Sequence, residues 1–325
     1  MQRAITTVSL GLVILLLALA LNGCASQASY PTKPVTLVVP QPAGGAMDLT
    51  ARTTAELLKG QLSQSIVVVN REGGSTTIGT AEVAQAKPDG YTIGLLSVAG
   101  ISLQPHRAAL PYKGPEDFTP VINLVNQPFV LAVNADSPYK TIQDLLAFAK
   151  ANPGKVRIGN SGVGTMPHLR AEQLRIASGI DFISVPHAGD AEGLPALLGG
   201  HIDAYAAHPS ALIPQVKAGK LRPLAVYEAQ HISAWPDIPT FKELGYDITG
   251  GVYYLIAAPK GTPNEIVKTL HDAFKKMMDG ADFAKFAQDN KMDIDYLNGA
   301  DLAKRLQSDY ETNGKVAELV GWKQR

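Results

Sequence analysis

The chain is almost without cysteine: among its 325 residues Cys24 is the only one, so no internal disulfide can form. It also lacks an excess of charge, because 29 basic residues balance 29 acidic ones. No basic run or stripe is present, which argues against a nucleic-acid-binding surface. An anion site in this chain must therefore use local backbone amides and helix dipoles instead of a global positive field.

The sequence patterns of familiar enzymes are missing too. Ser161 does not stand in a Gly-x-Ser-x-Gly elbow, since position 163 is valine. Gly162 and Gly164 are not followed by the third glycine of a dinucleotide site, and the seven histidines show no metal-ligand spacing. We therefore expect no enzyme activity, no cofactor and no metal; an exported hydrolase that uses Ser161 is the alternative.

The one long apolar run lies at the N-terminus. Arg3 precedes an apolar stretch at 8–21, which is short for a membrane span. The stretch ends in Leu-Asn-Gly-Cys, which resembles the lipobox of bacterial lipoproteins. We predict a lipoprotein signal peptide at 1–23, a lipid anchor at Cys24 and a tether at 24–33, which would hold the protein in the periplasm at a membrane surface. A plain signal peptide followed by a free thiol is the alternative.

The stretch 35–59 predicts a strand, a glycine loop and a helix. A β-branched run is followed by prolines and by Gly44 and Gly45, and from Met47 apolar residues return at helical spacing. Such a loop brings unpaired amides and the positive end of a helix dipole to one place. Its glycines allow a ligand to approach the backbone. This is one half of an anion site or, alternatively, an ordinary tight turn.

Strands and helices alternate along most of the chain. Strands at 65–70 and 91–96 each precede a loop of small residues, the second beginning at Ser97. In the second half, a strand at 156–159, a glycine loop and a helix at 166–178 repeat this order. The alternation predicts an α/β fold with mainly parallel sheets flanked by helices, and a ligand at the carboxyl ends of the strands.

The predicted domain organisation is two lobes with a cleft between them. Strands at 129–133 and 252–258 are the expected crossings from one lobe to the other. Lobe 1 would comprise 34–128 and 255–325, with the last helices packed on it, and lobe 2 would comprise 129–254. Closure of two such lobes around a ligand is a known binding architecture.

Several short segments in fixed order carry a family resemblance. They lie at 30–35, 39–48, 70–71 with 78–79, 87–92, 162–169, 198–203, 217–222 and 258–263. Together they resemble the substrate-binding receptors of tripartite tricarboxylate transporters, the Bug-type proteins, from about residue 30 to the C-terminus. The resemblance implies a type II-like periplasmic-binding-protein fold. It also implies a small carboxylate as ligand, which could be a di- or tricarboxylate, an amino acid or an aromatic acid. The implied partners are membrane permease subunits, and we expect a monomer. A subunit that senses a ligand for a membrane signalling partner is the alternative function.

The resemblance further implies that the amides of two facing loops hold a ligand carboxylate. The residues that match this pattern are Ala43, Gly44, Gly45 and Asp48 in lobe 1, and Ser161, Gly164, Thr165 and His168 in lobe 2. The expected ligand contacts also include Ser97, His187, Asp190 and Tyr253. Structural roles stay open for several of them: loop ordering for Asp48, capping for Thr165 and Asp190, and packing for His168.

The sequence departs from the family pattern at positions that border the far part of the cleft. Gln41 stands where an aromatic residue is usual, and His187 and Ala188 replace a tyrosine and a lysine. Asp190 follows where a small residue is common, and it would select a ligand that carries a donor or a cation. Leu255 replaces a frequent glycine. These departures leave the identity of the ligand open.

Overall fold

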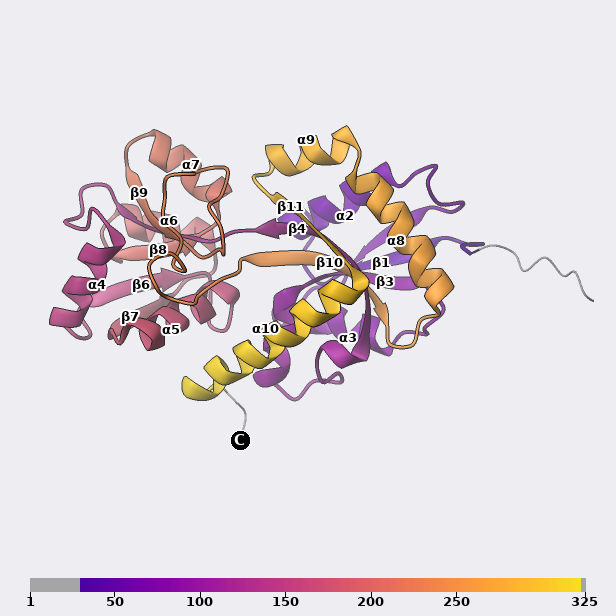
Figure 1. The fold of residues 1–325 in the computed structure, drawn as a ribbon, viewed down its shortest axis with the longest axis horizontal. Coiled ribbons are helices and arrows are strands. Elements are labelled where there is room, and N and C mark those ends of the chain that lie inside the picture. The colour runs from indigo at the N-terminus through magenta and orange to yellow at the C-terminus, as the bar shows by residue number, and fades with distance from the viewer. Residues whose placement is uncertain (1–29, 323–325) are drawn as a thin grey trace, which may run out of the picture.

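The computed structural model describes residues 30–322 as two α/β lobes lying side by side (Figure 1). The predicted signal peptide, Cys24 and residues 24–29 of the predicted tether lie outside the described residues. Within 30–322, none of the helices combines the length and the apolar character that crossing a membrane would need.

The sheet of lobe 1 has six strands in the order β11-β4-β10-β3-β1-β2. Its strands are β1 (Val35–Val39), β2 (Ile66–Asn70), β3 (Thr92–Ser97), β4 (Phe118–Gln127), β10 (Val252–Pro259) and β11 (Asp293–Asn298). β1 pairs in parallel with β2 and β3, whereas β10 is antiparallel to both β3 and β4, and β11 is antiparallel to β4. The sheet is therefore mixed and not mainly parallel, because β10 returns from lobe 2 beside the outgoing β4.

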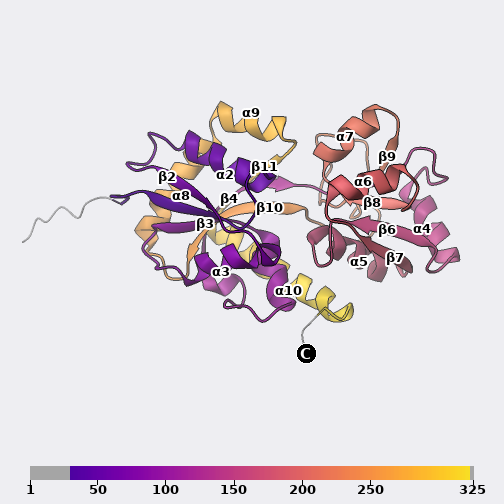
Figure 2. The same ribbon diagram turned by 180° about the vertical axis from the view of Figure 1, so that it is seen from behind.

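The helices of lobe 1 cover both faces of this sheet (Figures 1 and 2). They are α2 (Ala46–Leu57), α3 (Thr77–Gln85), α8 (Asn264–Met278), α9 (Ala281–Asp289) and α10 (Gly299–Leu319). The strand period of two sorts the core: Leu37 joins side chains of α2, α8 and α9, while its neighbour Val38 joins those of α3 and α10. Short helical turns lie at η1 (Gly74–Thr76), η2 (Ala99–Leu103), η3 (Gln104–His106) and η4 (Pro115–Asp117).

Lobe 2 repeats this plan with five strands in the order β7-β6-β8-β5-β9. Its elements are β5 (Val130–Asn134), α4 (Ile142–Ala151), β6 (Val156–Asn160), α5 (Met166–Ser178), β7 (Phe182–Pro186), α6 (Asp190–Leu198), β8 (Ala204–Ala207), α7 (Pro209–Lys217) and β9 (Leu221–Val226). β6 is parallel to β7 and β8, and β5 is antiparallel to β8 and β9, so this sheet is mixed as well.

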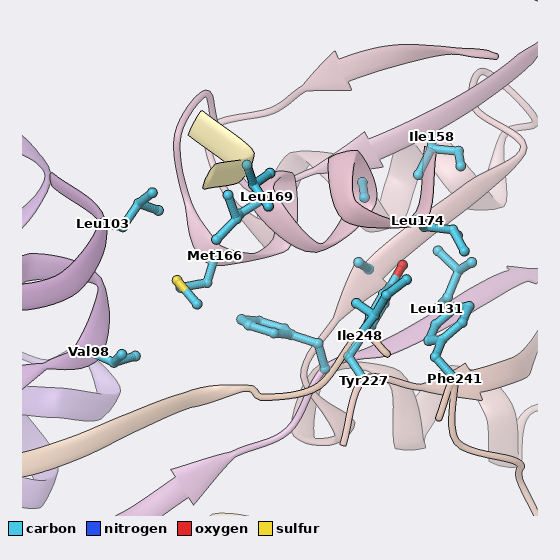
Figure 3. Close-up of a cluster of buried hydrophobic side chains, with 14 of the residues drawn as sticks. Val98, Leu103, Leu131, Ile158, Met166, Leu169, Leu174, Tyr227, Phe241 and Ile248 are labelled. Atoms are coloured by element: carbon cyan, nitrogen blue, oxygen red, sulfur yellow. The ribbon is translucent and has the colours of Figure 1, made fainter. Parts of the chain in front are cut away.

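The lobes are joined by more than the two expected crossings, which run from β4 to β5 and from β9 to β10. Figure 3 shows Val98 and Leu103 of lobe 1 near Met166 of lobe 2, and all three belong to one buried cluster. Helix α10 lies on lobe 1 as expected, but its far end also contacts α5, and Trp322 beyond it packs 4.5 Å from the His168 ring. Contacts of three kinds therefore hold the lobes together.

Candidate functional site

A cleft of about 610 Å³ lies between the lobes at the carboxyl ends of their parallel strands. Ser97 ends β3, and Ser161 and His208 directly follow β6 and β8. The crossings contribute Gln127, Phe129, Val252 and Tyr254. No lysine or arginine is among the described residues that line the cleft, and Asp190 is their one acid. A negatively charged ligand in this place must be held by neutral donors.

Helix N-termini supply such donors from both lobes. Ala46 and Met47 open α2, Met166 opens α5, and each lines the cleft. The N-cap residues Gly45 and Thr165 give no side-chain cap, and the first intrahelical bonds run only from Leu49 and Leu169. The first-turn amides of Ala46, Met47 and Asp48 in α2, and of Met166 and His168 in α5, therefore have no intrahelical partner, whereas Pro167 has no amide hydrogen. The two helix dipoles favour negative charge. The starts of α6 and α7 line the same cleft.

The loop before each of these two helices is locked in the same way. The Gly44 amide donates to the Asp48 carboxylate at 2.8 Å, and the Gly164 amide donates to Nδ1 of His168 at 3.0 Å. In both cases the acceptor lies four residues on, in the first turn of the helix. The side chain folds back onto its own loop, so the amides of Gly44 and Gly164 are already used.

Asp48 is fully engaged in this lock. It is 3% exposed and also accepts from Arg52 at 3.0 Å and from Asn70 at 2.9 Å. The hydrogen bond from Arg52 is the main cause that lowers its pKa, and the Gly44 amide and Asn70 act in the same direction. Asp48 does not line the cleft and orders its loop, which was the alternative; a ligand contact at Asp48 stays a prediction.

His168 plays the matching part in lobe 2. Because Nδ1 accepts from an amide, the ring proton is on Nε2, which lies 3.8 Å from the Glu172 carboxylate. Burial is the main cause that lowers the pKa of His168, and nearby Arg107 lowers it further. Trp322 packs on the ring, and His168 does not line the cleft. The structure gives His168 a role in positioning the loop, and its ligand contact stays a prediction.

Gly164 connects the lobes. Its carbonyl accepts from Gln104 Nε2 at 3.3 Å and from Arg107 at 3.5 Å, and both donors belong to lobe 1. The Arg107 guanidinium lies where a side chain at 164 would begin: a Cβ there would stand 1.8 Å from Arg107 Cζ. Glycine is therefore required for this contact between the lobes.

Gly164→Ala is expected to lower the free energy of unfolding by about 1–2 kcal/mol more than Gly44→Ala does. Both glycines have positive φ, +73° and +84°, so both alanines carry similar backbone strain. Only the alanine at 164 displaces Arg107, since a Cβ at 44 meets no atom within 4 Å. Urea unfolding measures both losses, and equal losses would show that the Arg107 contact adds nothing.

The other expected residues divide between the cleft wall and its surroundings. Ser97, Ser161, Thr165 and Asp190 line the cleft. Ala43, Gly44, Gly45 and Gly164 lie in the adjoining loops and are not among the residues that line it. His187 lies behind the wall, where its ring faces Tyr205 edge-on at 6.1 Å.

The alternation of Tyr253 and Tyr254 was predicted, but the choice of Tyr253 for the cleft is wrong. Tyr254 lines the cleft, and its hydroxyl donates to Gln127 at 3.0 Å. Tyr253 points to the opposite face, where its hydroxyl donates to Asp309 of α10 at 2.7 Å and Arg305 lies over its ring. Because α10 covers the face of the sheet to which Tyr253 points, Tyr254 is the tyrosine that faces the cleft.

Sequence reasoning placed Gln41 at the border of the cleft but missed His208, Phe129, Gln104 and Gln127. The Nδ1 atom of His208 lies 3.0 Å from the Pro128 carbonyl and therefore donates, which leaves Nε2 as an acceptor. Burial lowers the pKa of His208, and its ring stacks on Phe129 at 4.4 Å. His208 could have been predicted from the sequence, because it directly follows a strand whose carboxyl end lies at the cleft. Three glutamines also line the cleft: Gln41 in the loop after β1, Gln104 in η3, and Gln127 at the end of β4.

Comparisons with known protein sequences show which family this chain resembles. The model of the tripartite tricarboxylate transporter family receptor matches residues 50–322. A Cupriavidus necator protein described as "UPF0065 protein in gbd 5'region" is 34% identical over 99% of this chain and 98% of its own length. BugT of Bordetella pertussis is 33% identical over 80% of this chain and 82% of its own.

Solved structures of solute-binding proteins have the same fold as this chain. A TctC solute-binding protein from Polaromonas, without ligand, superimposes with a TM-score of 0.81 at 34% identity, over 89% of this chain and 99% of that one. Rpa4515 of R. palustris, solved with adipate, has a TM-score of 0.75 at 29% identity, over 90% of this chain and 99% of that one. MatC of Rhodopseudomonas palustris, with bound malate, has a TM-score of 0.73 at 25% identity, over 88% and 99%.

Proposed function

The chain belongs to the tripartite tricarboxylate transporter receptor family, whose members are solute-binding receptors, and we propose that it captures a small organic carboxylate in the cleft between its lobes. The observation that supports the carboxylate is the pair of uncapped helix starts, α2 and α5, that face the cleft from opposite lobes. Their free amides offer several donors to one carboxylate without any cationic side chain. Relatives solved with adipate and with malate fit this chemistry.

We further propose that the loaded receptor acts in the periplasm, as a monomer, and delivers its ligand to the subunits of a membrane permease. A lipid at Cys24 would hold it at the membrane surface. Membership of a transporter receptor family supports this sequence of events. A subunit that senses the ligand for a membrane signalling partner would use the same cleft, and uptake of the ligand by a strain lacking this protein separates the two functions.

A catalytic role is not part of the proposal. The relatives are receptors, and Ser161 has no histidine or carboxylate hydrogen-bonded to it among the described residues. Turnover of a bound ester or amide that disappears in Ser161→Ala would contradict this assignment.

Isothermal titration of the mature chain against a panel of carboxylates tests the proposal directly. Adipate, malate, succinate, citrate and their amides form a suitable panel, because each amide keeps the size of its acid and removes the charge. We expect at least one acid to bind with a Kd in the micromolar range or below, and its amide to bind at least a hundredfold more weakly. Equal binding of acid and amide, or no binding of any acid, would contradict the proposal.

A further inference from the structure

The carboxylate of Asp190 lies in the cleft without a cationic partner among the described residues, although the helix starts around the cleft favour anions. Asp190, at the start of α6, lines the lobe 2 wall of the cleft, and it forms no ion pair with any described residue. Its one side-chain hydrogen bond within residues 30–322 comes from the Tyr205 hydroxyl, at 3.0 Å to Oδ1. A second negative charge from a dicarboxylate near this wall would be repelled in a site of low dielectric constant.

Asp190 accepts a hydrogen bond from the buried Tyr205 hydroxyl, but it does not cap its own helix. Helix α6 begins at Asp190 with Gly189 as N-cap, and the Asp190 side chain binds Tyr205 instead of an amide of its own helix. The loop before α6 is tied by Glu192, which accepts from the Ala188 amide at 3.0 Å. The helix start is therefore held without the Asp190 side chain, and Asp190 lines the cleft.

His208 adds an acceptor to the same wall. Its Nδ1 is committed as a donor to the Pro128 carbonyl, so Nε2 presents a lone pair. The Asp190 carboxylate is close enough to act electrostatically on this ring. The lobe 2 wall thus presents two acceptors, a carboxylate and an imidazole nitrogen, beside the amide donors at the start of α5, while the start of α2 presents donors from lobe 1.

We propose that Asp190 and His208 form a cation subsite, and that the ligand is a zwitterion whose carboxylate lies at the helix starts and whose ammonium group lies against Asp190. An ammonium carries three donors and no acceptor, which matches the carboxylate of Asp190 and the Nε2 lone pair of His208. The proposal rests on the function proposed above and narrows its ligand class to amino acids or related ammonium carboxylates.

Matched ligand pairs test this inference by titration calorimetry on the mature chain. Aspartate and succinate, glutamate and glutarate, and β-alanine and propionate differ within each pair only by the ammonium group. We expect the ammonium member of at least one pair to bind tenfold or more tightly than its partner. In Asp190→Asn, which keeps the shape and an oxygen for Tyr205, we expect this preference to fall below threefold or to reverse.

Glu192→Gln is the matched control, because it removes one negative charge from the same helix turn at an exposed residue that does not line the cleft. We expect it to keep the wild-type preference. If the plain carboxylates bind as well as their ammonium partners and Asp190→Asn changes nothing, the cation subsite is refuted while the carboxylate receptor stands. If none of the six compounds binds and the carboxylate panel also gives no binding, both proposals fail.

Discussion

Replacing Arg170 with methionine is expected to lower the free energy of unfolding by about 3–5 kcal/mol, the loss typical of breaking a buried charge network. Arg170 of α5 is 3% exposed. Its Nε donates to the Gly250 carbonyl at 2.8 Å, and its Nη1 donates to Gln173 at 2.7 Å. Methionine fills the volume of the stem but leaves these acceptors and the nearby acids without their cation.

The acids make the loss larger than that of two hydrogen bonds. Burial lowers the pKa of Arg170, and the carboxylates of Asp309 and Glu228 oppose this effect, so the guanidinium compensates charges from α10 and from the segment after β9. Gly250 precedes β10, which is the return crossing between the lobes. Arg170 therefore ties α5 to the crossing and to α10 at once.

Arg175→Met is the control for Arg170→Met. Arg175 lies on the same helix and pairs with Glu172 at 2.7 Å, but its side chain is about one-third exposed. We expect its loss to stay below about 1 kcal/mol, as for other exposed ion pairs. Urea unfolding followed by circular dichroism gives both values, and similar losses for the two variants would contradict a special role for Arg170.

The features predicted from sequence are those with a local cause. A β-branched run, a glycine loop and a return of apolar residues predicted β1, its loop and α2, and the structure begins α2 at Ala46. The same pattern predicted β6 and α5. Because strand ends and helix starts follow from such local signals, the edge that holds the cleft was predictable.

Two departures from the expected site involve partners that are distant in sequence. Asp48 was expected at the ligand, but Asn70, 22 residues away, helps to saturate its carboxylate. Tyr253 was preferred to Tyr254, but α10 supplies Asp309, 56 residues on, to the hydroxyl of Tyr253. Periodicity establishes that two neighbouring side chains face opposite ways, and it contains no information on which face a later helix will cover.

The mixed sheets have the same explanation. Alternating strands and helices predicted parallel pairing, which holds for β1 with β2 and β3 and for β6 with β7 and β8. Pairing becomes antiparallel where β10 inserts between β3 and β4 after a long excursion through lobe 2. Insertion of a returning strand depends on the whole topology, so no local pattern indicates it.

A second large effect on stability is expected at Glu228. This residue lies after β9, beside the return crossing that leads into β10. Its Oε1 accepts from Asn126 of β4 at 2.9 Å, and a Cβ at Gly251 would lie 2.8 Å from this oxygen. Burial raises the pKa of Glu228 to about 7, although Asn126, Arg170 and Arg305 act in the opposite direction. The folded protein therefore binds a proton here over a pH range in which the unfolded chain has released it.

Glu228→Gln is expected to leave stability unchanged at pH 4 and to raise the free energy of unfolding by up to about 3 kcal/mol at pH 8. The sign follows from linkage. A carboxyl group whose pKa rises from 4.5 when unfolded to about 7 when folded loses stability as pH increases through this window, because the native state retains the proton longer. Glutamine is neutral at every pH and keeps an oxygen for Asn126.

The difference between variant and wild type isolates this group from the other titrations. His168 and His208, whose pKa values burial lowers, change stability in the same pH range, but they do so equally in both proteins. Urea unfolding at half-unit steps from pH 4 to pH 8.5 should give a difference that grows between pH 4.5 and 7 and is constant above pH 8. A difference that is flat over the whole range would show that Glu228 ionises alike in the folded and unfolded chains, and the crossing would then accommodate the carboxylate without loss.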